Sequence, residues 1–271
     1  MKWKRLLAGV LSAAMMATGA QLPVGVFAAP ISGSEADTQL SLSFEGNLTD
    51  ASQNNISVTS NKSVTYVEGI QGGQALDLDG STYLDLGTSG ALQPENLTVS
   101  CWIKPDAAMS GENILAWFKD DGNWASEGWY ISLNTDGYVS VRVPPGTGGQ
   151  ESPPAGTAAD FFPVGEWTHL VITFDGATNT CSVYRNGVAQ TVTTNGASSG
   201  INETTGHKYI GFNGPSYNGG YSNFALDEFN VLSTCATSQE VVAMYAAQGG
   251  AVDYATLAQA ELDAISFANT S

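Results

Sequence analysis

The chain has 271 residues and a formal net charge of −17. A charge of this sign and size repels nucleic acids and anionic membrane surfaces, so neither is expected as a partner. It suits a soluble extracellular protein, and it also suits the binding of hard cations. The length allows one large all-β domain or two small domains.

Residues 1–28 are typical of a secretory signal peptide. Basic residues at positions 2, 4 and 5 precede an apolar run at 6–20, and Val26 and Ala28 supply small residues for cleavage. The run is too short for a membrane-spanning helix, and no second hydrophobic span follows, so membrane insertion is not expected. Cleavage after Ala28 removes three basic residues and no acidic ones, which lowers the net charge from −17 to −20. We therefore predict a secreted or cell-surface protein.

The region from about 38 to 233 consists of short runs in which apolar and polar side chains alternate, separated by Gly, Asn, Asp and Pro. Alternation with a period of two is typical of strands that bury one face. The runs that qualify are 40–44, 75–80, 82–87, 97–105, 113–118, 128–134, 138–143, 166–176, 180–187, 207–212 and 224–232. So many short strands with turn signals between them predict an all-β sandwich.

One helix is predicted in this region, at 238–250. Ser238 is a suitable N-cap, and Val241, Val242 and Tyr245 share one face of the helix. Gly249 is a suitable stop signal at the C-terminal end of the helix.

Three other segments are notable. The loop at 144–160 is long and rich in Pro and Gly, and the loop at 213–223 alternates glycines with two tyrosines. Loops of this length in a compact domain are usually functional or disordered. Residues 251–271 form a predicted C-terminal helical segment, which is either a simple terminal helix or the start of a further domain.

Three cysteines follow the signal peptide, and an odd number cannot all pair within one molecule. Cys101 and Cys181 share parity with apolar strand residues, which places both side chains toward the interior, and Cys235 follows the last predicted strand. The three are either buried free thiols or one disulfide with a spare thiol. Their spacing matches no zinc site.

Five motifs in order carry a family resemblance. They are GGQALDLDGSTYLDLG, LTVSCWIKP, GEWTHLVITFDGATNTCSVYRNG, YIGFNG and ALDEFNVLSTCATSQEVVAMY. This order resembles the laminin G-like domains of the concanavalin A-like lectin/glucanase superfamily, over about residues 38–248. The resemblance implies two antiparallel sheets packed as a jelly roll. Bacterial members are common accessory modules of secreted glycoside hydrolases, and other members bind no sugar, so the fold alone does not settle the function.

Catalysis is not expected from this chain. Glycoside hydrolysis usually needs two carboxyl groups across the sugar, and glucanases of the superfamily carry them in a Glu-x-Asp-x-x-Glu strand that is absent here. Asp227 and Glu228 are adjacent, so a regular strand would point them to opposite faces. Asp85 lies on a predicted strand without an obvious partner, and His169 is expected to be packed and hydrogen-bonded.

Asp227 suggests a calcium site. It shares parity with Phe229 and Val231, so a regular strand would turn its carboxylate toward the core, where an unpaired charge costs several kcal/mol or more. The first and last strands of a jelly roll often lie side by side, and related modules often hold a structural Ca²⁺ there. We predict Ca²⁺ bound by backbone carbonyls and four side chains, Glu45, Asn47, Asp50 and Asp227. The alternative is that Asp227 accepts backbone N–H bonds and joins the two ends of the domain.

Two loops are expected to bind sugar, because they place aromatic rings beside amides and carboxylates. Sugar rings stack on exposed aromatic faces, and their hydroxyls bond planar polar groups. The loops are 119–128 and 213–223, and the predicted binding residues are Asp120, Asn123, Trp124, Asn213, Tyr217, Asn218 and Tyr221. The alternative is that each aromatic ring only anchors its own loop.

Together these features predict a secreted, non-catalytic carbohydrate-binding accessory module from a polysaccharide-degrading bacterium. The partner would be a polysaccharide or another glycan. A catalytic domain, if the protein has one, would lie beyond Ser271 in a longer chain. The alternative is a structural or cell-surface adhesion domain without a sugar site.

Overall fold

The computed structural model describes residues 35–109, 111–119, 128–133, 139–143, 161–192, 200–216 and 220–252. The chain divides into two units, Met1–Pro30 and Ile31–Ser271, and all described residues belong to the second. The predicted signal peptide, the loop at 144–160 and nearly all of 251–271 lie outside the described residues. None of the described helices combines the length and the apolar character needed to cross a lipid bilayer.

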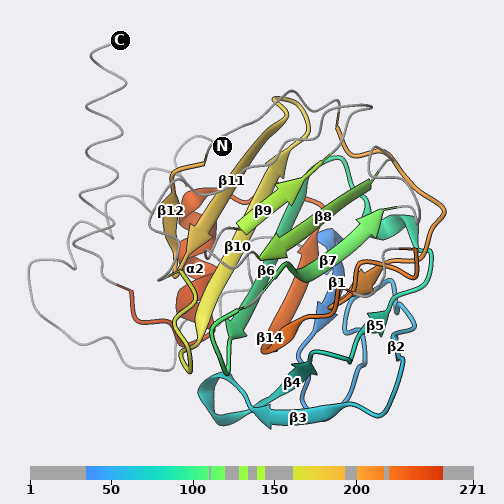
Figure 1. Cartoon of the computed structure of the whole chain (residues 1–271). Coiled ribbons are helices and arrows are strands. Elements are labelled where there is room, and N and C mark those ends of the chain that lie inside the picture. Colours follow the sequence, from blue (N-terminus) through green and yellow to red (C-terminus); the bar gives the residue numbers. More distant parts are fainter. Residues whose placement is uncertain are drawn as a thin grey trace, which may run out of the picture. The chain divides into compact units, whose positions relative to one another are not determined.

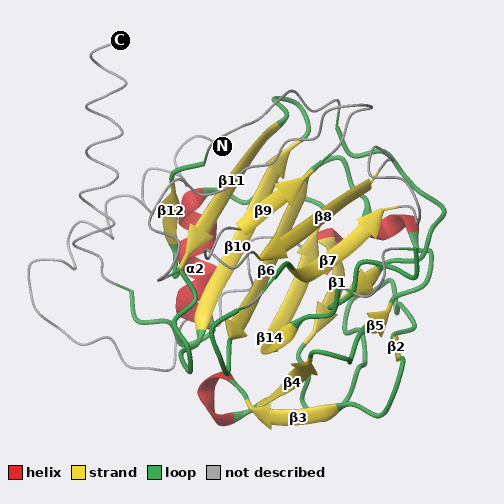
Figure 2. Cartoon of the chain, in the orientation of Figure 1, coloured by secondary structure: helices red, strands yellow, loops and turns green. Residues whose placement is uncertain are grey.

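Eight of the described strands form one antiparallel sheet, sheet A (Figures 1 and 2). Seven follow one another in space as β12 (Val188–Gln190), β11 (Thr180–Arg185), β10 (Thr168–Asp175), β6 (Leu97–Lys104), β14 (Asn223–Leu232), β4 (Gln74–Asp79) and β3 (Thr65–Glu68). The eighth, β1 (Thr38–Leu42), also pairs with β14. The first and last long strands are therefore neighbours, as expected for a jelly roll.

The other six described strands form sheet B, which is also antiparallel. Their order is β2 (Thr59–Ser60), β5 (Leu84–Asp85), β13 (Tyr209–Ile210), β7 (Asn113–Lys119), β8 (Gly128–Leu133) and β9 (Val139–Arg142). One large apolar cluster contains inward side chains from both sheets, among them Leu42, Phe44, Cys101 and Phe118. The predicted two-sheet antiparallel jelly-roll sandwich is confirmed.

All eleven predicted strands exist, and three short strands were missed. Strands β2, β3 and β12 span two to four residues, and none of them contains a fully buried side chain. Without a buried face they lack the apolar alternation by which sequence identifies a strand.

The three cysteines are free thiols, and burial raises the pKa of Cys181 to about 12.

Strand β14 contains a β-bulge. Asp227 pairs with Trp102 and Asn230 with Ser100, so Glu228 and Phe229 face a single residue of β6. Glu228 takes a φ of 48°, a left-handed conformation that side-chain-bearing residues rarely adopt. The bulge falls where β14 changes neighbour, since residues 223–226 pair with β4 and residues 229–232 pair with β1.

The bulge corrects the expected orientation of Asp227. Phe229 and Val231 do face the core, but the extra residue shifts the alternation, so Asp227 lies on the opposite face with its partner Trp102. Its side chain is nevertheless buried, at 1% exposure. The carboxylate is therefore covered from outside sheet A rather than immersed in the core.

Helix α2 (Ser238–Ala247) packs on that same outer face of sheet A. Val241 and Met244 are buried in a small apolar cluster with side chains of β10, β11 and β14. The N-cap is Thr237, one residue before the expected Ser238, because its hydroxyl accepts from the Glu240 N–H while the Glu240 carboxylate accepts from the Thr237 N–H. Three short 3₁₀ helices, η1 (Glu35–Asp37), η2 (Ile70–Gly72) and η3 (Gly90–Leu92), complete the described elements.

His169 lies beneath α2, as the prediction of a packed histidine requires. Its ring is fully buried, contacts the rings of Trp102 and Tyr245, and its Nε2 is 3.0 Å from the Ser100 hydroxyl. The buried Nδ1 has no hydrogen-bond partner in the described structure. Burial therefore lowers the pKa of His169 to about 3 from an ordinary value of 6.5.

This pKa predicts a loss of stability in acid. Below about pH 6.5 the unfolded chain binds a proton at residue 169, whereas the folded chain binds it only near pH 3. His169 therefore leaves the free energy of unfolding unaffected by pH above pH 6.5 and lowers it by about 1.4 kcal/mol per pH unit below pH 6.5. Urea unfolding from pH 7 to 4 should show a shallower decline for His169→Gln than for the unmodified protein.

Parallel pH profiles for the two proteins would contradict this account. If His169→Gln does not fold, NMR titration of the unmodified protein supplies the same test. The ring signals of residue 169 should then show no protonation between pH 7 and pH 4.

Candidate functional site

The outer face of sheet B carries a row of polar and aromatic side chains. Neighbouring strands place Thr59 opposite Asp85, Asp85 opposite Tyr209, and Tyr209 opposite Trp117. The row continues through Tyr130 on β8 to Arg142 on β9. These rings belong to an apolar cluster separate from the core between the sheets. Sheet B is therefore aromatic on its outer face as well as on its inner face.

Accessibility divides this face into two ends. Trp117 and Tyr130 are buried, at 0% and 2% exposure, whereas Tyr83 and Tyr221 are partly exposed. Tyr83 stacks on Phe212 with ring centroids 4.5 Å apart, and Phe212 stacks on Tyr221 at 5.0 Å. We call Tyr83, Phe212 and Tyr221 the ring platform. Two accessible tyrosine rings over a buried phenylalanine form a surface on which a flat ligand can stack.

A carboxylate–imidazole pair borders the ring platform. Nδ1 of His207 lies 2.9 Å from each oxygen of Asp85, and Oδ1 of Asp85 also accepts from the Gly87 N–H at 2.8 Å. Tyr209 links this pair to the platform, because its ring contacts both the His207 ring and the Tyr83 ring. Asp85 is also close enough to help raise the pKa of Tyr83, after burial and Tyr221.

Two of the seven predicted sugar-binding residues fall in the described structure, and both lie at this end of sheet B. Tyr221 is part of the ring platform, and Asn213 accepts the Gly220 N–H through Oδ1 at 3.0 Å. The Tyr221 ring packs against Phe212 and is partly exposed, an arrangement compatible with both sugar binding and the alternative of loop anchoring. The other five, Asp120, Asn123, Trp124, Tyr217 and Asn218, lie outside the described residues.

Sequence reasoning missed Tyr83 and His207 and left Asp85 without a partner. The alternation in TYLDLG contained a usable signal, since Leu84 and Leu86 are buried and therefore turn Tyr83 and Asp85 outward. No comparable signal existed for His207, because it reaches Asp85 across 122 positions of sequence.

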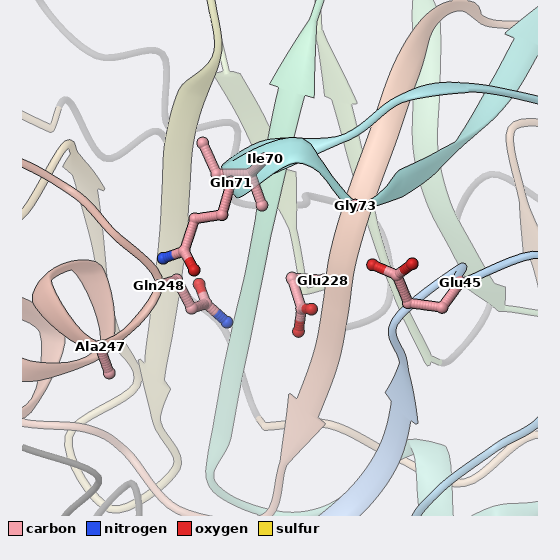
Figure 3. Close-up of a pocket in the computed structure, with 7 residues that line it drawn as sticks. All are labelled: Glu45, Ile70, Gln71, Gly73, Glu228, Ala247 and Gln248. Atoms are coloured by element: carbon pink, nitrogen blue, oxygen red, sulfur yellow. The ribbon is translucent and has the colours of Figure 1, made fainter. Parts of the chain in front are cut away.

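A second candidate site is a cavity on the outer face of sheet A. Its volume is about 310 Å³, and it is lined by Glu45, Ile70, Gln71, Gly73, Glu228, Ala247 and Gln248. We call it the junction pocket, because it lies at the β14 bulge between the η2 turn and the end of α2. Figure 3 shows the Glu228 side chain between those of Gln248 and Glu45. Gln248 is held by the Trp102 indole N–H at 2.8 Å.

Asp227 lies beside the junction pocket and is held by backbone groups. Oδ2 accepts from the Ile70 N–H and Oδ1 from the Glu228 N–H, both at 2.9 Å. Acceptance of backbone N–H bonds is the alternative considered from the sequence, but the donors lie in the η2 turn and in β14 itself rather than at the N-terminal end of the domain. The approach is so close that a Cβ on Gly69 would lie 2.6 Å from Oδ2, so the turn requires glycine there.

The carboxyl groups at the junction disfavour one another's charge. Burial raises the pKa of Asp227 to about 6, and Glu45 adds to the rise while the two N–H bonds oppose it. Burial, then Asp227 and Glu45, raise the pKa of Glu228 to about 7. The adjacent Asp227 and Glu228 were expected to be separated by the strand, yet the bulge leaves both within the field of Glu45.

The four predicted calcium ligands have different surroundings. Glu45 interacts with Asp227 and accepts the Gln74 N–H at 3.1 Å. Asp50 instead accepts hydrogen bonds from Ser41, Ser52 and Ile56, and Asn47 accepts the Thr49 N–H. Among the described side chains, no group of three or more His, Cys, Asp or Glu residues could hold a metal ion. A calcium ion here would therefore need Glu45 and Asp227 together with uncharged oxygen ligands.

Structural comparison finds similar folds in domains of other proteins. The binding domain of Paraclostridial Mosquitocidal Protein 1 matches with a TM-score of 0.63 and 21% identity, over 78% of this chain and 52% of that chain. Domain 4 of AbnA, a GH43 extracellular arabinanase from Geobacillus stearothermophilus solved with arabinotriose, matches with a TM-score of 0.58 and 21% identity, over 76% and 97%. A structure of botulinum neurotoxin type C, whose cell entry depends on two ganglioside molecules, matches with a TM-score of 0.60 and 14% identity, over 79% and 52%.

These likenesses show the fold, since all three identities are low. The matched region makes up about half of each of the two toxin chains but nearly the whole arabinanase domain. No curated protein matches the sequence. The profile of one family matches residues 78–242, which is more than half of the chain and includes both β5 and β14. The chain therefore belongs to the concanavalin A-like lectin/glucanase superfamily.

Proposed function

We propose that this protein is a secreted, non-catalytic carbohydrate-binding module. The observation that carries the proposal is the ring platform, in which the partly exposed rings of Tyr83 and Tyr221 stack on buried Phe212. Asn213 and the Asp85–His207 pair supply polar groups beside these rings. An aromatic face bordered by amides and carboxylates is the arrangement that binds a sugar ring and its hydroxyls.

The comparisons support a binding role for this fold. One similar structure is an arabinanase domain solved with arabinotriose, and another belongs to a toxin that interacts with gangliosides. By analogy, this module would act as an accessory to a polysaccharide-degrading enzyme, in the same chain or beside it. A tethered module of this kind raises the local concentration of the enzyme at its substrate and needs no catalytic group of its own.

Removing either accessible ring should weaken glycan binding. We expect Tyr83→Ala and Tyr221→Ala each to lower affinity for a bound polysaccharide by about tenfold, because a lost stacking contact is worth about 1.4 kcal/mol. Affinity gel electrophoresis of the full chain against a panel of soluble polysaccharides measures this loss.

The matched control is Tyr66→Ala, which removes a partly buried tyrosine from β3 on sheet A. This variant should migrate like the unmodified protein, and thermal melting identifies any variant that fails to fold. Retention of the unmodified protein by no glycan would contradict the proposal and favour an adhesion domain without a sugar site.

We also propose a structural Ca²⁺ ion at the junction pocket. Glu45 and Asp227 provide carboxylate oxygens, and the backbone carbonyls and amide side chains around them are the uncharged oxygens that Ca²⁺ accepts. A cation would offset the burial and, secondarily, the carboxylate repulsion that together raise the pKa values of Asp227 and Glu228. It would tie the loop after β1 to β14 and so stabilise the fold.

Calcium should then raise the melting temperature of chelator-treated protein. At a concentration of about 100 times Kd, binding adds about 2.7 kcal/mol, or roughly 5–10 °C for a domain of this size. Asp227→Asn should abolish the increase. Asp175→Asn, which removes an acid from the β10–β11 hairpin, should keep it. An unchanged melting temperature on chelation and on calcium addition would contradict the site.

A further inference from the structure

The Asp85–His207 pair is accessible to a ligand and is not a buried structural interaction. The Asp85 side chain is 27% exposed and that of His207 is 53% exposed. Two groups fix the carboxylate, because the Gly87 N–H and the imidazole Nδ1 approach it from different segments. A fixed but accessible carboxylate can bind a ligand without first losing side-chain freedom.

The remaining hydrogen-bonding capacity of the pair is for donors. An ionised carboxylate accepts about four hydrogen bonds and donates none. Among the described contacts Oδ1 accepts from Gly87 and His207, whereas Oδ2 accepts from His207 alone, so Oδ2 keeps an open position. Because an ionised Asp85 only accepts, the proton between the two groups is on Nδ1 of His207, which leaves the other ring nitrogen, Nε2, for a ligand hydroxyl.

The pair lies within reach of a ligand stacked on the ring platform. Tyr83 and Asp85 are two residues apart and point to the same side of β5, which separates them by about 7 Å along the strand. The His207 and Tyr83 rings both contact Tyr209, at 6.2 and 5.7 Å between centroids. A sugar on Tyr83 therefore has its edge beside the carboxylate.

The charge at this edge disfavours anionic ligands. Asp85 would face the carboxylate or sulfate of an acidic sugar, and neither of those groups offers a proton donor at neutral pH. The nearby cation Lys62 is already paired with Asp79 at 2.7 Å, which limits its attraction for anions. The chain as a whole is also strongly acidic, at −17.

We propose that Asp85, positioned by His207, binds the hydroxyls of an uncharged sugar stacked on the ring platform. The ligand class is a neutral polysaccharide with free neighbouring hydroxyls, one for Oδ2 and one for Nε2. Uronic-acid and sulfated glycans are excluded. This inference rests on the proposed function and names its substrate class.

The experiment uses the full chain and affinity gels of arabinan, galactan, xylan and mannan beside polygalacturonate and alginate. The unmodified protein should be retained by at least one neutral gel and by neither anionic gel. Asp85→Asn keeps the size of the side chain but replaces one acceptor with a donor, so it should weaken the neutral interaction at least tenfold. His207→Gln should weaken it less, because Asp85 keeps its Gly87 hydrogen bond.

Asp175→Asn is the control for charge, since it also removes one acid but lies on sheet A. It should bind like the unmodified protein, and melting temperatures separate lost binding from lost folding. Unchanged affinity in a folded Asp85→Asn, or retention on polygalacturonate as strong as on the neutral gels, overturns the inference and leaves the proposed function intact. Retention on none of the six gels overturns both.

Discussion

The bulge at Glu228 is the constraint on which the rest of sheet A depends. A strand has two edges, yet β14 pairs with β6 on one edge and with both β4 and β1 on the other. The change of neighbour takes place at the bulge, where Asp227 turns outward and accepts the Ile70 N–H. The left-handed backbone at Glu228 and the burial of an acid each cost free energy. The hydrogen bonds of the three ladders offset that cost.

Sheet B exposes little of its outer face to solvent. An antiparallel sheet commonly packs one face and leaves the other to solvent, but the outer face here is also aromatic and largely buried. Among the described rings of this face, Tyr83 and Tyr221, at the end near β5, are partly exposed. The proposed sugar-binding surface therefore lies at the edge where β2, β5 and β13 meet. Short strands at that edge leave room for loop residues to approach the rings.

The sequence was sufficient where structure follows from local alternation. Eleven strands, the inward cysteine at 101 and the pairing of first and last strands could all be predicted, because each depends on residues close in sequence or on a general property of jelly rolls. Asp227 could not be oriented, because a single inserted residue reverses every side chain that follows it. The loop tyrosine and asparagine at 221 and 213 lie close together, but their predicted role in sugar binding stays a prediction.

The partners of the site were harder to predict than its position. Whether Tyr83 and Asp85 face outward follows from Leu84, but that His207 meets Asp85 depends on the path of the whole chain between them. Asp50 is a further case in which the partners could not be predicted from the sequence. Its place in an acidic loop suggested a metal ligand, while its surroundings provide N–H and hydroxyl donors from its own loop and from β1.

The pairing of β1 with β14 also bears on how the domain resists traction. Thr38 at the start of β1 lies opposite Leu232 at the end of β14, so the chain enters β1 and leaves β14 at the same end of the paired strands. A force that pulls on the chain before β1 and after α2 would first detach α2 from sheet A. It would then break the hydrogen bonds between β1 and β14 one after another rather than all at once. Separation of the two strands would therefore begin at Thr38 and Leu232, on sheet A rather than at the rings of sheet B.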